Sequence, residues 1–473
     1  MSERGRSQRE RGPGPRRKRD AFSLGPATGA DRTALAPSGP SEERAEPDVS
    51  LLLRRTGFGT TGAEIEAATR RGYEATVDAL VHPGADPGAT ATPPPDLSGE
   101  PARPPAPDDK DARRAYARQL RSRSAALTLW WLDRMVRVRH PLVERLTFTW
   151  HGHWATSIQK VRSPAMMLRQ NQTLRSLGRG DFRELARAMV RDPALLVWLD
   201  GQKNKKGKPN ENLARELMEL FTLGVGHYSE TDVREAARAL TGWRVDRTHA
   251  TAAPLARHHD DGSKTVLGVT GELDDRSLVD LLTARPESAA FVATRLWSRH
   301  GSATLPPDTL RRLVAAYGPG RDVTALLRAM FLEPAFRADR SSLVASPVEY
   351  VAGVFRALDV AVPRDGRAGR ALLGTLDALG QVPFRPPSVG GWPSGLAWLS
   401  TAATRERLTF AAAMARTADL DVVAGSKDRP GAAAYLLGVD AWTDRTLAAL
   451  RDAAADPVRL VTLALVSPEY LAR

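Results

Sequence analysis

The sequence predicts an all-α protein, a multi-helical single body with a small β-hairpin near 244–270 and a disordered N-terminal tail. Apolar residues recur at helical spacing through most of the chain after residue 48. Several segments begin with the side chains typical of helix N-caps. The alternation of strand and helix patterns that indicates a parallel sheet does not occur. With 473 residues, of which 42% are apolar, the chain is long enough to bury a conventional core.

The predicted tail covers residues 1–48. It is rich in Gly, Pro, Ser, Arg and Glu and has no periodic apolar positions, so burial cannot offset the entropy of ordering it. Residues 1–20 carry eight Lys or Arg against three Asp or Glu. Such a charge is typical of a solvated tail and also allows weak contacts with nucleic acid.

Arg16 and Arg17 resemble the start of a twin-arginine export signal, but no apolar segment follows them. We therefore expect a cytoplasmic protein. No run of about 18 apolar residues occurs, so we expect no transmembrane helix.

The body, residues 49–473, is expected to form one domain. Its first predicted elements are a helix opening at 49–53, a capping box at Thr61 and Glu64, a helix over 73–81, an extended Pro-rich surface loop over 83–109 and a long helix from about Lys110 to Val138.

The next part, residues 140–245, holds most of the polar motifs. Its clearest helix is Asn210–Leu223, where one apolar stripe contains Leu213, Leu217, Leu220 and Phe221. β-branched residues and turn formers over 244–270 predict the hairpin. The C-terminal part, 270–473, is helical again, except for a Pro/Gly/Trp segment at 382–400.

The chain has no cysteine, which excludes disulfides, thiolate metal sites and cysteine nucleophiles. A metal would need His, Asp, Glu or backbone oxygen ligands. The first candidates are His151 and His153, within Trp150–Trp154. On a regular helix they point about 200° apart, but a break at Gly152 would let them converge. The alternative is one core histidine and one surface histidine.

The second candidate is Glu216, as a metal ligand or general base beside the two histidines. Arg215 is a candidate catalytic or anion-holding residue on the same helix. The alternative is a solvated ladder of ion pairs. The neighbouring residues that we assign to binding are Asn210, Glu211 and Asn212.

Four of the nine lysines of the chain lie in the loop 201–208. A glycine-flanked lysine loop that leads into a helix can hold an anion, and Lys206 and Lys208 are its candidates. A flexible surface turn is the alternative. Further binding candidates are His259, Asp260 and Lys264, in a turn, and Trp392, as a stacking surface or as packing.

Several motifs occur together in a fixed order: RRTGFG (54–59), WWLDRM (130–135), ERLTFTWHGHWATSIQKV (144–161), DPALLVWLD (192–200), GKPNENLARELMELFTLGVGHYSETDVREAARALTGW (207–243), HDDGSKTVLG (259–268), SPVEY (346–350) and VGGWPSGLAW (389–398). In these segments the chain resembles the bacterial family catalogued as domain of unknown function 1800. The resemblance covers about residues 49–473.

The resemblance implies no established reaction. It implies that His151, His153, Asn210, Glu211, Arg215 and Glu216 carry function. It also implies export in many relatives, which is the alternative location here, and a sulfatase-like partner. Where the family usually has WHNHF, this chain has Gly152 and Trp154 and keeps both histidines.

The leading hypothesis is a ligand-binding pocket in a helical body, with a divalent metal and metal-assisted hydrolysis of an anionic or polyhydroxyl substrate. The alternative is a non-catalytic binding or assembly protein that works with the sulfatase-like partner. Whether the protein is an enzyme stays open at this point.

Overall fold

The computed structural model describes residues 47–100, 105–340 and 343–473. Residues 1–46 of the predicted tail lie outside that range. The first helices are α1 (Pro47–Thr56), α2 (Gly62–Arg71), α3 (Tyr73–Val81), α4 (Pro87–Thr90) and α5 (Lys110–Arg137). The motif-rich part forms α6 (Pro141–His153), α7 (Ile158–Val161), α8 (Pro164–Leu177), α9 (Phe182–Val190), α10 (Pro193–Trp198), η1 (Gly201–Lys203), α11 (Asn212–Glu216), η2 (Leu217–Thr222) and α12 (Glu230–Ala239).

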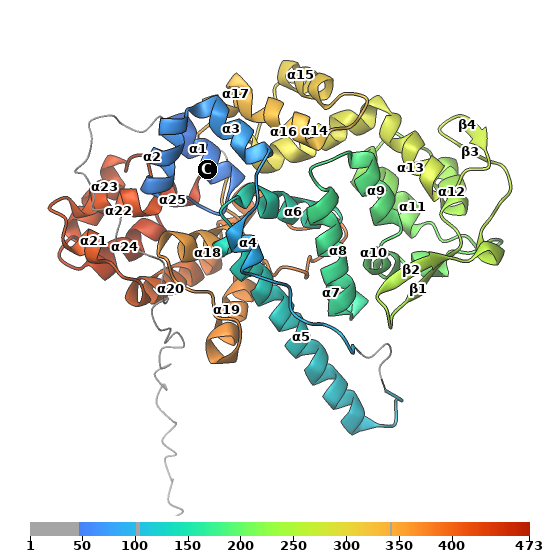
Figure 1. Cartoon of the computed structure of the whole chain (residues 1–473), viewed down its shortest axis with the longest axis horizontal. Helices are drawn as coiled ribbons and strands as arrows, with labels where there is room; N and C mark the ends of the chain where they lie inside the picture. Colours follow the sequence, from blue (N-terminus) through green and yellow to red (C-terminus); the bar gives the residue numbers. More distant parts are fainter. Residues whose placement is uncertain (1–46, 101–104, 341–342) are drawn as a thin grey trace, which may run out of the picture.

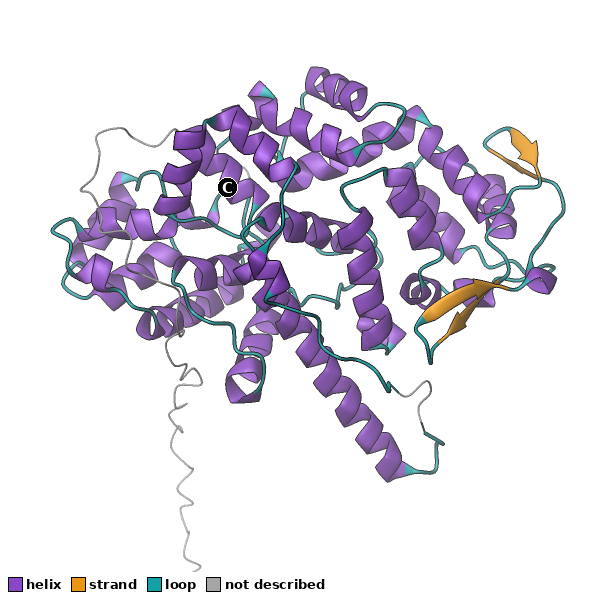
Figure 2. Cartoon of the chain, viewed as in Figure 1, coloured by secondary structure: helices purple, strands orange, loops and turns teal. Residues whose placement is uncertain are grey.

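Two short antiparallel hairpins separate this part from the C-terminal helices (Figure 2). They consist of β1 (Trp243–Asp246), β2 (Thr251–Pro254), η3 (Ala256–His258), β3 (Lys264–Val266) and β4 (Val269–Gly271). The C-terminal elements are α13 (Asp275–Ala284), α14 (Pro286–His300), α15 (Pro307–Tyr317), α16 (Val323–Leu332), α17 (Pro334–Ala338), α18 (Pro347–Ala357), α19 (Gly366–Ala378), η4 (Gly395–Trp398), α20 (Thr401–Thr417), α21 (Asp421–Ala424), α22 (Arg429–Leu437), α23 (Asp444–Asp452), α24 (Pro457–Leu465) and α25 (Pro468–Leu471).

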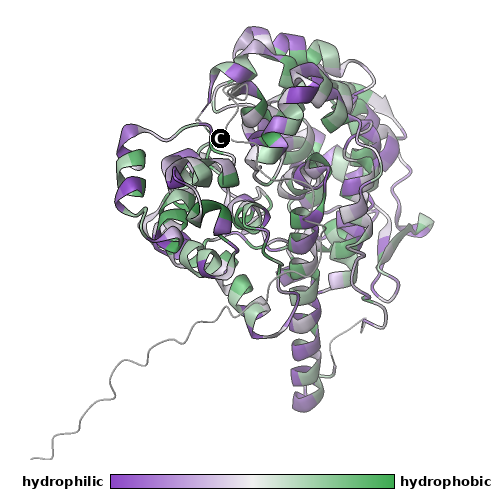
Figure 3. Cartoon of the chain, turned by 60° about the vertical axis from the view of Figure 1, so that its left-hand side comes forward, coloured by the Kyte–Doolittle hydropathy of each residue, from purple (hydrophilic) through white to green (hydrophobic). Residues whose placement is uncertain are grey.

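The two ends of the described chain lie together. Helices α1 to α3 lie beside the C-terminal helices on one side of the molecule, and α9 to α14 with the hairpins form the other side (Figure 1). The N-terminal part of α5 projects away from the body, and its exposed turns are mostly hydrophilic (Figures 1 and 3). Among the described residues, no helix is both long and apolar enough to cross a membrane.

The buried apolar residues form two cores. One is built mainly from α5, α18, α20 and α24, and the other from α9 and α12 to α16. Helix α6 contributes to both, because Phe148 packs in the first core while Leu146 and Trp150 pack in the second. This helix therefore lies where the two halves of the molecule meet.

Helix α6 begins at Pro141, where a missing N–H costs nothing. Its buried Glu144 accepts from Trp131 Nε1 at 2.9 Å and pairs with Arg134 and Arg175, each at 2.6 Å. The carboxylate thus ties α6 to α5 and α8. The two guanidinium groups outweigh the effect of burial and hold the pKa of Glu144 below its usual value.

The sequence predicted the helical class and the order of the main elements correctly. The capping box at Thr61 and Glu64 and the helix Tyr73–Val81 are both present. Two details differ. The segment predicted to be extended contains α4, because Asp86 accepts from Ala89 N–H and caps one helical turn. The region predicted to form one hairpin forms two.

Candidate functional site

His151 lies in a buried aromatic cage. Its ring is 5.3 Å from Phe384 and 5.4 Å from both Trp131 and Trp392. Its Nε2 accepts from the Phe384 N–H at 2.9 Å, and burial lowers the pKa of His151 to about 3. Phe384 has a φ of 66°, which is unfavourable for a residue with a side chain. His151 therefore fixes a strained turn of the 382–400 segment on α6.

His153 lies on the other side of α6, near Phe221 and Phe291. Its Nε2 lies 3.0 Å from the carbonyl oxygen of Phe221, so the ring nitrogen donates there. Burial and the nearby Arg295 lower the pKa of His153 to about 3. Phe221 belongs to η2, a π-helical turn whose wider hydrogen bonding replaces the last turn of the predicted helix 210–223. His153 thus connects α6 to η2.

The structure does not bring His151, His153 and Glu216 together as metal ligands. The two histidines occupy opposite sides of α6, since Gly152 lies inside the helix and does not break it. Glu216 is half-buried, and burial with the adjacent Glu219 raises its pKa. Across residues 47–100, 105–340 and 343–473, no group of three or more His, Asp or Glu side chains is placed to hold a metal.

The other candidates on this helix form surface ion pairs and turns. Arg215 pairs with Glu230 at 2.7 Å and with Glu211 at 3.1 Å. Asn210 Oδ1 accepts from the Asn212 N–H, and the Asn210 N–H donates to Asn204 Oδ1. The Glu211–Arg215 pair matches one contact of the ion-pair ladder that the sequence left open as the alternative.

The lysine loop and the 258–264 segment do come together. The Lys206 N–H donates to the carbonyl oxygen of His258, and its side chain pairs with Asp261. Asp260 pairs with Arg238 at 2.8 Å, and buried Lys264 donates to the carbonyl oxygen of Gly262.

The ring of His259 lies 3.0 Å from the carbonyl oxygen of Thr241, and Lys208 is exposed. Trp392 is buried and stacks on Phe148, with 5.7 Å between ring centroids. Trp392 therefore packs the 382–400 segment onto α6.

A cavity of about 40 Å³ lies between α1, α6, α14, α18 and η4. That is room for a few waters or one small anion. Its lining is dominated by arginine and hydroxyl side chains, together with one carboxylate and a few apolar groups. The lining residues are Arg55, Arg145, Ser298, Arg299, Leu343, Val344, Ser346, Glu349, Ser394, Gly395, Trp398 and Arg473.

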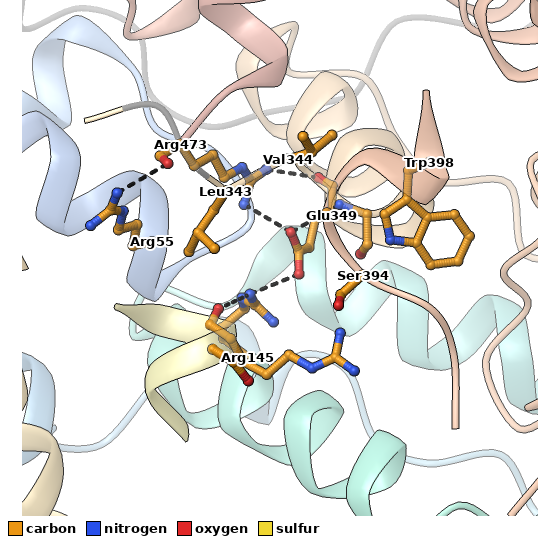
Figure 4. A pocket seen from close by; sticks show the side chains of 12 residues that line it. Arg55, Arg145, Leu343, Val344, Glu349, Ser394, Trp398 and Arg473 are labelled. Carbon is orange, nitrogen blue, oxygen red and sulfur yellow. Dashed lines mark hydrogen bonds and ion pairs between the residues drawn. The ribbon is translucent and has the colours of Figure 1, made fainter. Parts of the chain in front are cut away.

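Among the described residues that line the cavity, Glu349 provides the only side-chain carboxylate. Its Oε1 lies 2.8 Å from Arg145 Nη2, and its Oε2 lies 3.5 Å from Arg473 Nη1. Figure 4 shows Glu349 between these two arginines, with Ser394 and Trp398 beside it. Four guanidinium groups of the described lining thus face one side-chain carboxylate.

Some of the arginine groups in this lining lack hydrogen-bond partners or have only weak ones. Among the described residues of the lining, the Nε atoms of Arg145 and Arg55 are buried and make no hydrogen bond. Arg299 makes one long bond, 3.3 Å from its Nη2 to the carbonyl oxygen of Trp392. Unpartnered buried donors are uncommon in folded proteins, and each is costly.

Burial also affects the ionisation of these groups. It lowers the pKa of Arg55 and of Arg145 to about 10 and lowers that of Arg299. His300 directly follows the lining residue Arg299. Its Nε2 lies 3.0 Å from Thr149 Oγ1, and its pKa is lowered by burial and by nearby Arg145. The region holds positive charge in a poorly solvated place, a situation that an anion relieves.

The family described as "Protein of unknown function (DUF1800)" matches residues 51–472. The chain belongs to the DUF1800 family. No curated protein and no solved structure matches this DUF1800 chain.

Four of the segments that carry the family resemblance supply most of the cavity lining of this DUF1800 chain. RRTGFG contributes Arg55, and the segment 144–161 contributes Arg145. SPVEY contributes Ser346 and Glu349, and 389–398 contributes Ser394, Gly395 and Trp398. Sequence reasoning missed these residues because it weighed each motif by its own chemistry. The available signal was that separate motifs each carried an arginine, a hydroxyl or a carboxylate.

Proposed function

We propose that this protein binds a small oxyanion, the anionic group of its ligand or substrate, in the arginine-lined cavity. The observation that carries the proposal is the set of four guanidinium groups around one small cavity with a single side-chain carboxylate. Guanidinium groups suit this ligand because their donors match the spacing of oxyanion oxygens.

Arg299 is the group best placed to bind the anion. Arg55 donates to main-chain oxygens of Phe336, Asp339 and Arg473, and Arg145 is already paired with Glu349. Arg299, by contrast, has no ion pair within the part of the chain that the structure describes. An anion could therefore bind Arg299 and Arg145 Nε without displacing Glu349.

Calorimetric titration with inorganic phosphate and with sulfate, at low ionic strength, tests the proposal. We expect Arg299→Gln to weaken binding at least about ten-fold, since a hydrogen bond to a charged group contributes roughly 1.5–3 kcal/mol. The matched control is Arg311→Gln, since the Arg311 side chain is exposed on α15, and we expect this variant to bind like the wild type. Equal binding by Arg299→Gln and wild type, at equal melting temperature, would contradict the proposal.

Oxyanion binding does not by itself imply catalysis. Metal-assisted hydrolysis at Glu216 and action with a sulfatase-like partner stay predictions from the sequence and the resemblance. Metal analysis of the purified protein, with His151→Ala and Glu216→Ala variants, tests the first. Co-purification with a sulfatase-like protein tests the second, and a monomer that turns substrate over alone would exclude it.

A further inference from the structure

We propose that the ligand is an amphiphilic anion, with an oxyanion head in the arginine-lined cavity and an apolar chain along Leu396 and Leu399. This inference rests on the proposed function and names the class of ligand. It starts from the segment η4, of which Gly395 and Trp398 line the cavity.

Leu396 and Leu399 are exposed beside that lining. Their exposed fractions are 78% and 45%, and they are two of only seven large hydrophobic side chains exposed among the described residues. The Leu399 N–H donates to the carbonyl oxygen of Leu396 at 2.9 Å. In such a turn, side chains three residues apart lie on the same side, so the two leucines form one apolar edge.

Leu396 lies between the lining residues Gly395 and Trp398 in the chain, and Leu399 directly follows Trp398. Leu343, Val344 and Trp398 supply apolar groups to the cavity itself, beside the guanidinium groups. Because the cavity holds only about 40 Å³, it accepts a head group and leaves any attached chain outside. The surface next to η4 is where that chain meets apolar side chains.

A small molecule fits this surface better than a protein partner. Two exposed leucines are far fewer than the roughly 20–30 residues that each partner contributes to a stable protein interface. A short alkyl chain, in contrast, needs only a strip of apolar surface next to its anchored head. The fixed charge in the cavity then sets the orientation of the ligand.

The test compares inorganic phosphate with methyl, butyl and octyl phosphate by calorimetry, each below its micelle concentration. We expect octyl phosphate to bind at least about ten-fold more tightly than methyl phosphate, from burial of part of the chain. A comparison of octanoate with acetate measures the same effect of chain length on an anion with a carboxylate head. A gain with chain length for either head group supports the proposal.

Variants identify the residues that produce the gain in affinity with chain length. Leu396→Ser with Leu399→Ser should remove the gain with chain length and leave methyl phosphate binding unchanged. Val422→Ser is the matched control, since Val422 is 61% exposed on α21. Arg299→Gln should weaken every phosphate, whatever its chain.

The possible failures differ from one another. If no phosphate or carboxylate binds at all, the proposed function itself fails. If the head groups bind but affinity does not change with chain length, the amphiphile proposal is overturned and the oxyanion site stands. A chain-length gain that survives the double leucine variant, or octyl binding that survives Arg299→Gln, also overturns it.

Discussion

Gly152 and Gly391 meet where α6 contacts the 382–400 segment, but the two glycines differ in what they allow. A Cβ at Gly391 would lie 2.3 Å from the carbonyl oxygen of Gly152, and its φ is +81°. A Cβ at Gly152 would meet only Trp392, at 3.9 Å, an ordinary contact. Only position 391 therefore requires glycine.

We predict that Gly391→Ala destabilises the protein by more than about 2 kcal/mol, through backbone strain and this clash. Gly152→Ala should be neutral or stabilise it by up to ~1 kcal/mol, because alanine favours helix. Urea denaturation of both variants measures the difference. A small loss of unfolding free energy in Gly391→Ala would mean that the 382–400 segment does not lie on α6 as described.

Asp192 is a buried carboxylate whose pKa is raised to about 6 by burial. Its Oδ1 accepts from the Leu195 N–H and from Gln170 Nε2, both at 2.8 Å. Because the folded-state pKa is raised, the stability that this group contributes is complete below pH 4. It is lost as the pH rises through 6. An asparagine at this position keeps both hydrogen bonds through its own Oδ1 and carries no charge.

We therefore predict a pH-dependent effect of Asp192→Asn. Between pH 4 and pH 7, the unfolding free energy of the variant should rise relative to the wild type by roughly 2–3 kcal/mol. Asp322→Asn, at the exposed N-cap of α16, controls for loss of a capping carboxylate. A difference between Asp192→Asn and wild type that stays constant with pH would refute a raised pKa for Asp192.

His151 and His153 show what residue-level reasoning can reach. Their residue type and the family resemblance directed attention to the correct helix. Their hydrogen-bond partners, Phe384 and Phe221, come from segments 233 and 68 residues away. Nothing in the local sequence indicates such partners, so the ligand role predicted for these histidines depended on a convergence that the fold does not produce.

At the scale of elements, α6 is held by Glu144 against α5 and α8. Removing this carboxylate would leave Arg134 and Arg175 partly buried and unpaired. We predict that Glu144→Ala lowers the free energy of unfolding by about 3–5 kcal/mol. Glu184→Ala, which breaks the exposed pair with Arg187 on α9, should cost less than about 1 kcal/mol. Chemical denaturation that gives similar losses for the two variants would contradict this role of Glu144.

The helix over 210–223 was predicted from its apolar stripe, and the structure contains it as α11 followed by η2. The π-helical turn could not be predicted, because the spacing of apolar residues is compatible with an unbroken α-helix. In this turn the carbonyl oxygen of Phe221 accepts a hydrogen bond from His153. This contact joins two elements, and the pattern within one element does not contain it.

At the scale of the whole molecule, helical class and element order follow from local patterns, whereas the candidate site does not. Arg55, Arg145, Arg299 and Arg473 are up to 418 residues apart, and each looks like an ordinary surface arginine in a chain with many. They meet because α1 packs against α6, and Arg473 at the other end of the described chain contacts α1 and Glu349. That packing is a property of the complete fold.

The proposed oxyanion would bind among these arginines. Crystals soaked in selenate, a sulfate analogue, test it directly, since selenium scatters anomalously and native crystals contain none. We predict one strong anomalous peak within hydrogen-bonding distance of Arg299 and Arg145. The absence of a peak in the cavity, with selenate bound only at other surface sites, would contradict the account.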